Sequence, residues 1–220
     1  ATEPVDVDGV PLRIVHRPGK ADLTPFAAEV GAFCLRYFAD YYGIPYPDKK
    51  MDMVGLPDFA QGAMENLGCI TYRESLLLVD LDKATQPEVA TVADVIAHEL
   101  AHMWFGDLVT MRWWDDLWLN ESFATYASVI CMAEATHWTN AWTTFANLEK
   151  TWAYRQDQLP STHPISADIR DIEDVEVNFD GITYAKGASV LKQLVAWVGR
   201  DAFVAGVRTY FDRHAWGNTE

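Results

Sequence analysis

Apolar and polar residues recur with regular spacings along most of the chain, and the spacing changes near residue 84. In the first part, short apolar runs separated by turn residues predict three strands, at 10–16, 51–56 and 69–79. Thr24 and Pro25 open a helix between the first two strands, because proline is favoured at the first helical position. Its apolar residues follow helical spacing as far as Gly43, which ends the helix.

From residue 85 onward the spacing is mainly helical. Thr85 and Glu88 form a capping-box pattern, and the apolar residues after them follow one helical stripe to Gly106. The same spacing predicts further helices from about Asn120, through 142–152, near 180–198 and over 201–214. We therefore predict an α+β fold in which a sheet-rich subdomain (1–84) precedes a mainly helical subdomain (85–220).

Charge and composition narrow the range of partners. The chain has 32 acidic and 17 basic residues and a net charge of −15, which argues against nucleic acid and favours cationic ligands such as peptides with a free amine. No apolar stretch is long enough to span a membrane, and the first residues, "ATEPVDVDG", lack the basic and apolar regions of a signal peptide, so we expect no membrane partner and a cytoplasmic location. The three cysteines suggest no disulfide framework. The missing initiator methionine is typical of a piece excised from a longer protein.

The segment "HELAH" at 98–102 carries the clearest chemical signal. On a helix, residues four apart lie on one face, so His98 and His102 are placed to bind one metal ion. Glu99 lies beside such an ion, where a base for a metal-activated water belongs. A shuffled chain of this composition would match the pattern only about once in a hundred times, so the motif alone favours a zinc site over a chance match, and a third ligand would strengthen the interpretation.

Glu121 is the candidate for that third ligand. Catalytic zinc sites have three protein ligands and leave a fourth position for water. Glu121 begins the next predicted helix, and eighteen residues separate it from His102. A glutamate in a first helical turn is ordinarily a capping or dipole-complementing residue, but its spacing from the histidines favours a metal ligand. The other histidines have no comparable partner and are interpreted as structural or surface residues.

Four motifs together resemble a known family: "GAMEN", "HELAHMWFGDLVT", "WWDDLWLNES" and "FDGITYAKGASVL". The chain resembles the aminopeptidase N family of gluzincin zinc metallopeptidases, in particular the catalytic domain of a bacterial member, and the likeness runs over essentially its whole length. The resemblance implies a thermolysin-like fold, with an N-terminal mixed β-sheet subdomain followed by a helical subdomain.

The resemblance also implies a role for each residue of the zinc site. His98, His102 and Glu121 would bind one Zn²⁺ per chain, and Glu99 would act as general base and then as general acid. Tyr184 matches the tyrosine that donates a hydrogen bond to the tetrahedral intermediate. Without the resemblance, Tyr184 would be interpreted as a core aromatic residue of an amphipathic helix.

The "GAMEN" segment indicates which peptides are cut. In the family it is an edge strand along which the substrate lies, an instance of strand addition, so the expected substrate-binding residues are Gly62, Ala63, Met64, Glu65 and Asn66. By resemblance, Glu65 holds the free α-ammonium of the peptide. We expect Met64 and the residues near it to line the side-chain pocket. The expected reaction is removal of single N-terminal residues by attack of a metal-activated water. Taken alone, the segment would indicate only a turn.

Three departures from the family pattern stand out. Ser122 replaces a more usual glycine, which we expect to alter packing only. Ser128 occupies a position where many members carry a carboxylate that supports a zinc-bound histidine, so Asp115 or Asp116 is a candidate substitute. Family members are also longer, with flanking domains that complete the amine site and close the cavity.

Three other functions share parts of these motifs. A leukotriene-type epoxide hydrolase shares the zinc site and the tyrosine, but that branch is associated with "GGMEN" rather than "GAMEN". A non-catalytic module with the same fold would typically have lost the base or a ligand, and here Glu99 and the three ligands are present. A thermolysin-like endopeptidase would have no use for Glu65 as an amine anchor.

Overall fold

The computed structural model describes all residues from 1 to 220. The chain divides into two compact units, Ala1–Met103 and Trp104–Glu220. The sequence pattern changes after residue 84, but the units divide after Met103. The long helix between these two points packs against the helix and sheet of the first unit and therefore belongs to it. A mixed sheet followed by a helical region agrees with the predicted α+β class.

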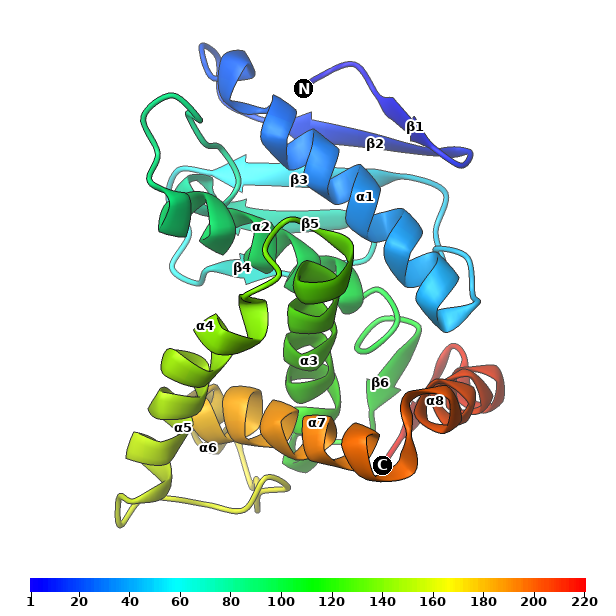
Figure 1. Cartoon of the computed structure of the whole chain (residues 1–220), viewed down its shortest axis with the longest axis vertical. Coiled ribbons are helices and arrows are strands. Elements are labelled where there is room, and N and C mark those ends of the chain that lie inside the picture. Colours follow the sequence, from blue (N-terminus) through cyan, green and yellow to red (C-terminus); the bar gives the residue numbers. More distant parts are fainter. The chain divides into compact units, whose positions relative to one another are not determined.

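The first unit combines a five-stranded sheet with two long helices. Its elements are β1 (Val5–Val7), β2 (Val10–Val15), the 3₁₀ turn η1 (Ala21–Leu23), α1 (Pro25–Tyr42), β3 (Met51–Leu56), β4 (Ala63–Met64), β5 (Cys69–Arg73), the 3₁₀ turn η2 (Glu74–Leu76) and α2 (Gln86–Ala101). The strand order is β1-β2-β3-β5-β4 (Figure 1). The inner pairs, β2–β3 and β3–β5, are parallel, whereas both outer pairs are antiparallel. The sheet is therefore mixed, as the resemblance implied.

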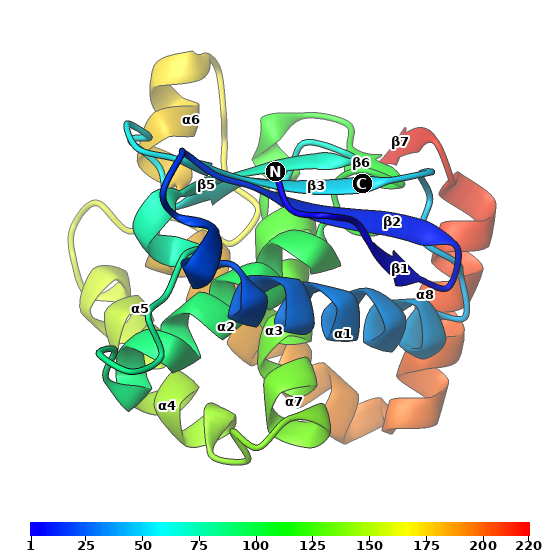
Figure 2. The same ribbon diagram turned by 90° about the horizontal axis from the view of Figure 1, so that it is seen from above.

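Alternate strand positions build the core of this unit. Leu12 pairs with Met51 in the β2–β3 register, Met53 pairs with Ile70 in the β3–β5 register, and all four side chains are fully buried. Figure 2 shows α1 and α2 along the same side of the sheet. A Cβ atom at Gly31 of α1 would lie 2.8 Å from the Met53 sulfur, so glycine lets this helix approach the sheet closely.

Both ends of α1 and the start of α2 lie where the sequence predicts them, whereas α2 ends at Ala101, before the predicted end at Gly106. Pro25 begins α1, and Gly43 follows its last residue in a left-handed conformation with φ of 67°, which glycine adopts at little cost. Thr85 caps α2, and its backbone N–H donates to Glu88 Oε2 at 2.7 Å. The predicted capping box is thus confirmed.

The predicted strand over 69–79 is too long. Strand β5 ends at Arg73 and the chain turns into η2, where the Glu74 carboxylate accepts two hydrogen bonds from Arg17. Leu77 and Leu78 are still buried, but after the turn. A continuous apolar run does not by itself distinguish strand from other buried backbone.

The second unit is mainly helical. Its elements are β6 (Val109–Met111), the 3₁₀ turn η3 (Trp114–Asp116), α3 (Trp118–Ala135), α4 (Ala141–Asn147), α5 (Glu149–Asp157), α6 (Ile172–Asn178), the π-helical turn η4 (Ile182–Lys186), α7 (Gly187–Val198), α8 (Arg200–His214) and β7 (Gly217–Thr219). Strands β6 and β7 form a two-stranded parallel sheet. Stacked rings of Phe105 and Phe123, with Phe211 against Phe105, are part of the aromatic core.

Two details of this unit differ from the sequence-based expectation. The single helix expected through 142–152 is two helices, which break at Leu148, where φ is −102° and ψ is −71°. Leu148 and Trp152 share the apolar spacing of the segment but are 64% and 41% exposed, so the stripe does not mark one buried face. The helix expected near 180–198 begins as a π-helical turn and becomes α-helical only at Gly187.

None of the helices contains an apolar stretch that could span a membrane. None of the three cysteines forms a disulfide. The cytoplasmic location stays a prediction.

We predict that Asp52 stabilises the sheet through two cations. Its carboxylate accepts two hydrogen bonds from Arg13 and one from Lys50. Burial raises the pKa of this carboxyl, but the two cations outweigh burial and hold the pKa below its usual value. Asp52→Asn should lower the free energy of unfolding by about 1–2 kcal/mol at pH 7, measured by urea denaturation.

The pH dependence of this effect follows from the lowered pKa. The stabilisation should be fully present above the unfolded-state pKa of about 3.9 and disappear as pH falls through the folded-state pKa. The difference between wild type and Asp52→Asn should therefore shrink below about pH 4. Asp58→Asn, at an exposed position, is the control. Equal stability of all three proteins at pH 7 would contradict the assignment.

Candidate active site

The C-terminal end of α2 places two imidazole rings side by side. His98 lies in the last turn of the helix and His102 caps it, still with helical backbone angles. Their Nε2 atoms are 3.0 Å apart and their rings lie at 79° to each other. His102 is almost fully buried and His98 is partly exposed. The structure thus brings this predicted pair together as the spacing requires.

This geometry fits a shared metal ion. Zinc–nitrogen bonds of about 2.0–2.1 Å with tetrahedral angles place two ligand nitrogens roughly 3.4 Å apart, close to the observed separation of 3.0 Å. Each of His98, His102 and Glu121 can offer one ligand atom to a metal ion. Two imidazoles and one carboxylate are a donor set that catalytic zinc uses. The residues present therefore fit the metal that the sequence predicts.

Glu99 lies between the two histidines in sequence and is buried, with 7% of its surface exposed. Its electrostatic neighbour in the sheet is Tyr72 of β5, which is fully buried. Burial and then the Glu99 charge raise the pKa of Tyr72 well above its usual value, with a further contribution from Cys34. Glu99 is therefore close enough to the sheet for its charge to be felt at β5.

The "GAMEN" segment lies at the edge of the same sheet. Ala63 and Met64 form β4, which pairs antiparallel with β5 and is the last strand in the order. Met64 is 44% exposed. The backbone N–H of Arg73 donates to the Gly62 carbonyl at 2.8 Å and fixes the start of the segment. The family's edge strand is thus present, whereas the substrate-binding roles of its residues stay predictions.

Glu65 follows β4 directly and lies near the histidine pair. Its Oε1 atom is 3.8 Å from His102 Nδ1. The carboxylate is largely buried, with 15% of the side chain exposed. Asn66 keeps the end of the segment in place, since its amide nitrogen contacts Thr71 Oγ1 at 3.4 Å. The first unit therefore holds the predicted amine anchor beside a predicted metal ligand.

Glu121 lies in the first turn of α3, as predicted, and is 4% exposed. The next residue, Ser122, is fully buried, and its hydroxyl donates a 2.6 Å hydrogen bond to the Thr183 carbonyl. The expectation that Ser122 alters packing only is wrong, because the side chain joins two segments of the second unit. A Cβ atom at Gly187 would lie 1.8 Å from this hydroxyl, so glycine at 187 makes room for it.

Tyr184 lies on the π-helical turn and is partly exposed. Its ring centroid is 6.3 Å from that of Trp152 and 6.5 Å from that of Phe179. π-Helical turns are rare and are frequent at functional sites. Sequence periodicity did not reveal this turn, and it did not single out Asp180, whose buried carboxylate accepts hydrogen bonds from the backbone of Ile182 and Thr183.

Asp116, one of the two candidates for histidine support, has other partners in the second unit, and so has Ser128. The Asp116 carboxylate accepts hydrogen bonds from Trp118 and Ser166, and the Ser128 hydroxyl donates to the Thr125 carbonyl in its own helix. Support of a histidine by Asp115 or Asp116 stays a prediction.

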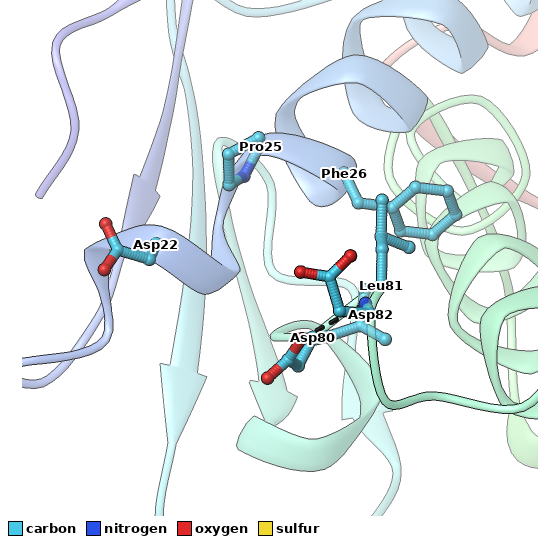
Figure 3. Close-up of a pocket in the computed structure, with 7 residues that line it drawn as sticks. Asp22, Pro25, Phe26, Asp80, Leu81 and Asp82 are labelled. Atoms are coloured by element: carbon cyan, nitrogen blue, oxygen red, sulfur yellow. Dashed lines mark hydrogen bonds between the residues drawn. The ribbon is translucent and has the colours of Figure 1, made fainter.

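A separate pocket of about 160 Å³ lies at the start of α1 (Figure 3). Its lining includes three carboxylates, those of Asp22, Asp80 and Asp82. Asp80 already accepts hydrogen bonds from Lys83 and from the Asp82 backbone, and the Lys83 ammonium holds its pKa below the usual value. None of the predicted site residues lines this pocket.

Comparison with known proteins identifies relatives along the whole chain. The family model described as "Peptidase family M1 domain" matches residues 26–220. "Aminopeptidase N" of Streptomyces lividans is 57% identical over 97% of this chain, "Aminopeptidase M1" of Arabidopsis thaliana is 44% identical over 97%, and "Probable aminopeptidase 2" of Sulfurisphaera tokodaii is 46% identical over 95%. The chain spans 25%, 24% and 27% of the lengths of these relatives.

We predict that His102 is required for metal binding. His102→Ala should reduce the bound divalent metal from one ion per chain to none after dialysis. Loss of a residue that only supports a ligand typically lowers metal affinity by about 10–100-fold, and loss of a ligand itself should lower it further. The measurement is metal content by inductively coupled plasma spectrometry. His16→Ala, on a histidine that contacts only the neighbouring Arg17 carbonyl, should keep the ion. Retention of the full metal content by His102→Ala would rule out the assignment.

Proposed function

The chain belongs to peptidase family M1, and we propose that it is the catalytic domain of a zinc-dependent aminopeptidase. It would remove single N-terminal residues from peptides that carry a free amine. His98, His102 and Glu121 would hold one zinc ion, and the sheet-rich and helical parts would together make one catalytic domain. The names of its relatives and the site residues it carries support this proposal.

The observation that carries the proposal is the position of Glu65. Its carboxylate lies 3.8 Å from the ring of His102. A peptide whose α-ammonium pairs with Glu65 would have its first peptide bond close to the metal, with little room for further residues before the cut. An internal or acetylated peptide has no charge to offer this carboxylate. The α-amino pKa of about 7.7–8.0 keeps much of the substrate protonated at neutral pH.

The edge strand β4 supports the same orientation. The substrate would lie along it as an added strand, with backbone hydrogen bonds supplying affinity and a side-chain pocket supplying preference. Met64, exposed on β4, is our candidate for the lining of that pocket. The acidic balance of the chain, with a net charge of −15, favours the approach of a cationic terminus.

Two further residues would carry the proton and the developing charge. Zinc bound at the three ligands would supply a water of pKa about 7 and polarise the scissile carbonyl. Glu99 would accept the proton of the attacking water and pass it to the leaving amine. The Tyr184 hydroxyl would donate a hydrogen bond to the carbonyl oxygen as negative charge develops there, and loss of such a donor typically costs about 10²–10³ in rate.

Flanking domains are the remaining proposed partners. The chain spans about a quarter of the length of its relatives, so we propose that further domains complete the amine site and close the cavity. Activity is therefore best assayed on the full-length protein that contains this chain.

We predict that cleavage depends on a free amine and on Glu65. One peptide in free and N-acetylated forms should be cut only in the free form, one residue at a time, as followed by mass spectrometry. Glu65→Gln should lower kcat/KM for the free peptide by about 10–100-fold, because a charge pair near the metal is lost.

Glu29→Gln is the matched control for this experiment, since it removes the same charge from an exposed position of α1 in the same unit. It should leave kcat/KM within about twofold of wild type. Equal cleavage of the free and acetylated peptides would indicate an endopeptidase and remove Glu65 as the amine anchor.

We predict that Glu99 is needed for turnover but not for metal binding. Glu99→Gln keeps the size of the side chain and removes its basicity, so kcat should fall by at least about 10²-fold, while the zinc content stays at one ion per chain. Hydrolysis rate and metal content are measured on the same sample. Loss of the ion would instead make Glu99 a ligand or a structural residue.

A further inference from the structure

The π-helical turn that carries Tyr184 is held by buried side chains from elsewhere in the second unit. Thr183, the residue before Tyr184, has both backbone polar groups bound by side chains. Its N–H donates to Asp180 Oδ1 at 3.0 Å, and its carbonyl accepts from Ser122 Oγ at 2.6 Å. Thr183 itself is 2% exposed. The backbone at Thr183, which leads into Tyr184, therefore has little freedom to rotate.

Asp180 holds the beginning of the turn. Besides Thr183, its Oδ1 atom accepts from the Ile182 N–H at 2.9 Å, and its backbone carbonyl accepts from the Tyr184 N–H at 3.0 Å. The Asp180 side chain thus acts as a cap, which satisfies the first N–H groups of a helical segment.

The second oxygen of Asp180 has two side-chain partners. Gln156 Nε2 donates to Oδ2 at 2.6 Å, and His163 Nε2 contacts the same atom at 2.7 Å. The Gln156 carbonyl oxygen also accepts from the Gly181 N–H at 2.7 Å. Since Asp180 is only 6% exposed, loss of an acceptor here would leave buried donors unpaired, which is costly.

Ser122 ties this turn to α3. The residue stands directly after Glu121, and no exposed surface remains on it. Its hydroxyl fits against Gly187, where any side chain would overlap it. One short hydrogen bond to Thr183 therefore couples the helix that carries a proposed metal ligand to the turn that carries a proposed hydrogen-bond donor.

We propose that Ser122 and Asp180 are positioning residues for Tyr184. Asp180 accepts from the Thr183 N–H and Ser122 donates to the Thr183 carbonyl, so together they hold the two peptide units that meet at Thr183 and set where the Tyr184 hydroxyl points relative to Glu121. This proposal rests on the proposed function, because it presupposes that Tyr184 acts in the reaction. Catalytic geometry is sensitive to such support, since a displacement of about 1 Å can cost about 10²-fold in rate.

A double-mutant cycle with Tyr184→Phe tests this proposal in the zinc-loaded full-length protein. Ser122→Ala should lower kcat about 10-fold with KM changed less than about twofold, because it affects positioning rather than ground-state binding. In the Tyr184→Phe background the same substitution should change kcat less than about twofold, since the group it positions is gone. Asp180→Asn should follow the same pattern. It replaces one carboxylate oxygen with an amide NH₂ group, which cannot accept a hydrogen bond, so either Gln156 or the backbone N–H groups of Ile182 and Thr183 lose their acceptor.

Ser128→Ala is the matched control. Ser128 is a buried serine on the same helix, but its hydroxyl bonds only to the Thr125 carbonyl of α3. Its replacement should leave kcat within about twofold of wild type in both backgrounds. Zinc content and backbone amide hydrogen exchange over 182–186 are measured on every variant. Ser122→Ala should keep the ion and speed exchange in this turn, whereas Ser128→Ala should change neither.

Each other outcome has a distinct meaning. If Tyr184→Phe alone leaves kcat unchanged, the proposed role of Tyr184 fails. If Tyr184→Phe lowers kcat but Ser122→Ala keeps its full effect in that background, the positioning proposal is overturned while the proposed function stands. Loss of zinc from Ser122→Ala would also overturn it, because the serine would then act through Glu121.

Discussion

Two imidazole nitrogens held 3.0 Å apart at the end of α2 are the constraint on which the first unit depends. A metal ion shared by His98 and His102 tolerates little movement of either ring, so the last turn of α2 has to be rigid. Ile96 and Leu100 are fully buried along this helix, and burial of such a side chain contributes about 1.5–3 kcal/mol. The capping box at Thr85 fixes the other end. The capped start of α2 and its buried core side chains therefore both help to hold the two imidazole rings in place.

Strand β5 connects that helix to the substrate-binding segment. Tyr72 pairs with Ala63 of β4 through the backbone, and its buried side chain is close enough to Glu99 for the carboxylate charge to raise the pKa of the phenol. Tyr72 thus lies between β4, the strand proposed to bind the peptide, and α2, the helix proposed to supply the base. The 3.8 Å separation of Glu65 and His102 follows from this arrangement. We infer that the distance from amine to cleavage point is set by the sheet and α2 together.

The sequence predicted most of what depends on local spacing. Both ends of α1 and the start of α2 are as predicted, and the histidine pair lies as helical geometry requires. Tyr184 and Glu65 could be singled out only through the family resemblance, since locally they are typical of a core aromatic and a loop charge. Their roles are proposals.

The features that the sequence did not reveal depend on contacts between distant segments. Ser122 and Thr183 are 61 residues apart, so their hydrogen bond has no local signal. The break at Leu148 and the short strand pair β6–β7 likewise depend on tertiary packing rather than on periodicity. The π-helical turn at 182–186 keeps the apolar spacing of a helix and differs only in its hydrogen bonds.

The proposed function rests on one zinc ion bound by His98, His102 and Glu121. Anomalous diffraction at the zinc absorption edge, from crystals of the metal-loaded protein, would locate this ion. We expect one strong peak, about 2.0–2.2 Å from Nε2 of both histidines and from a Glu121 carboxylate oxygen, with Glu99 outside the coordination sphere. A peak at other side chains, or one bound by Glu99 in place of Glu121, would contradict it.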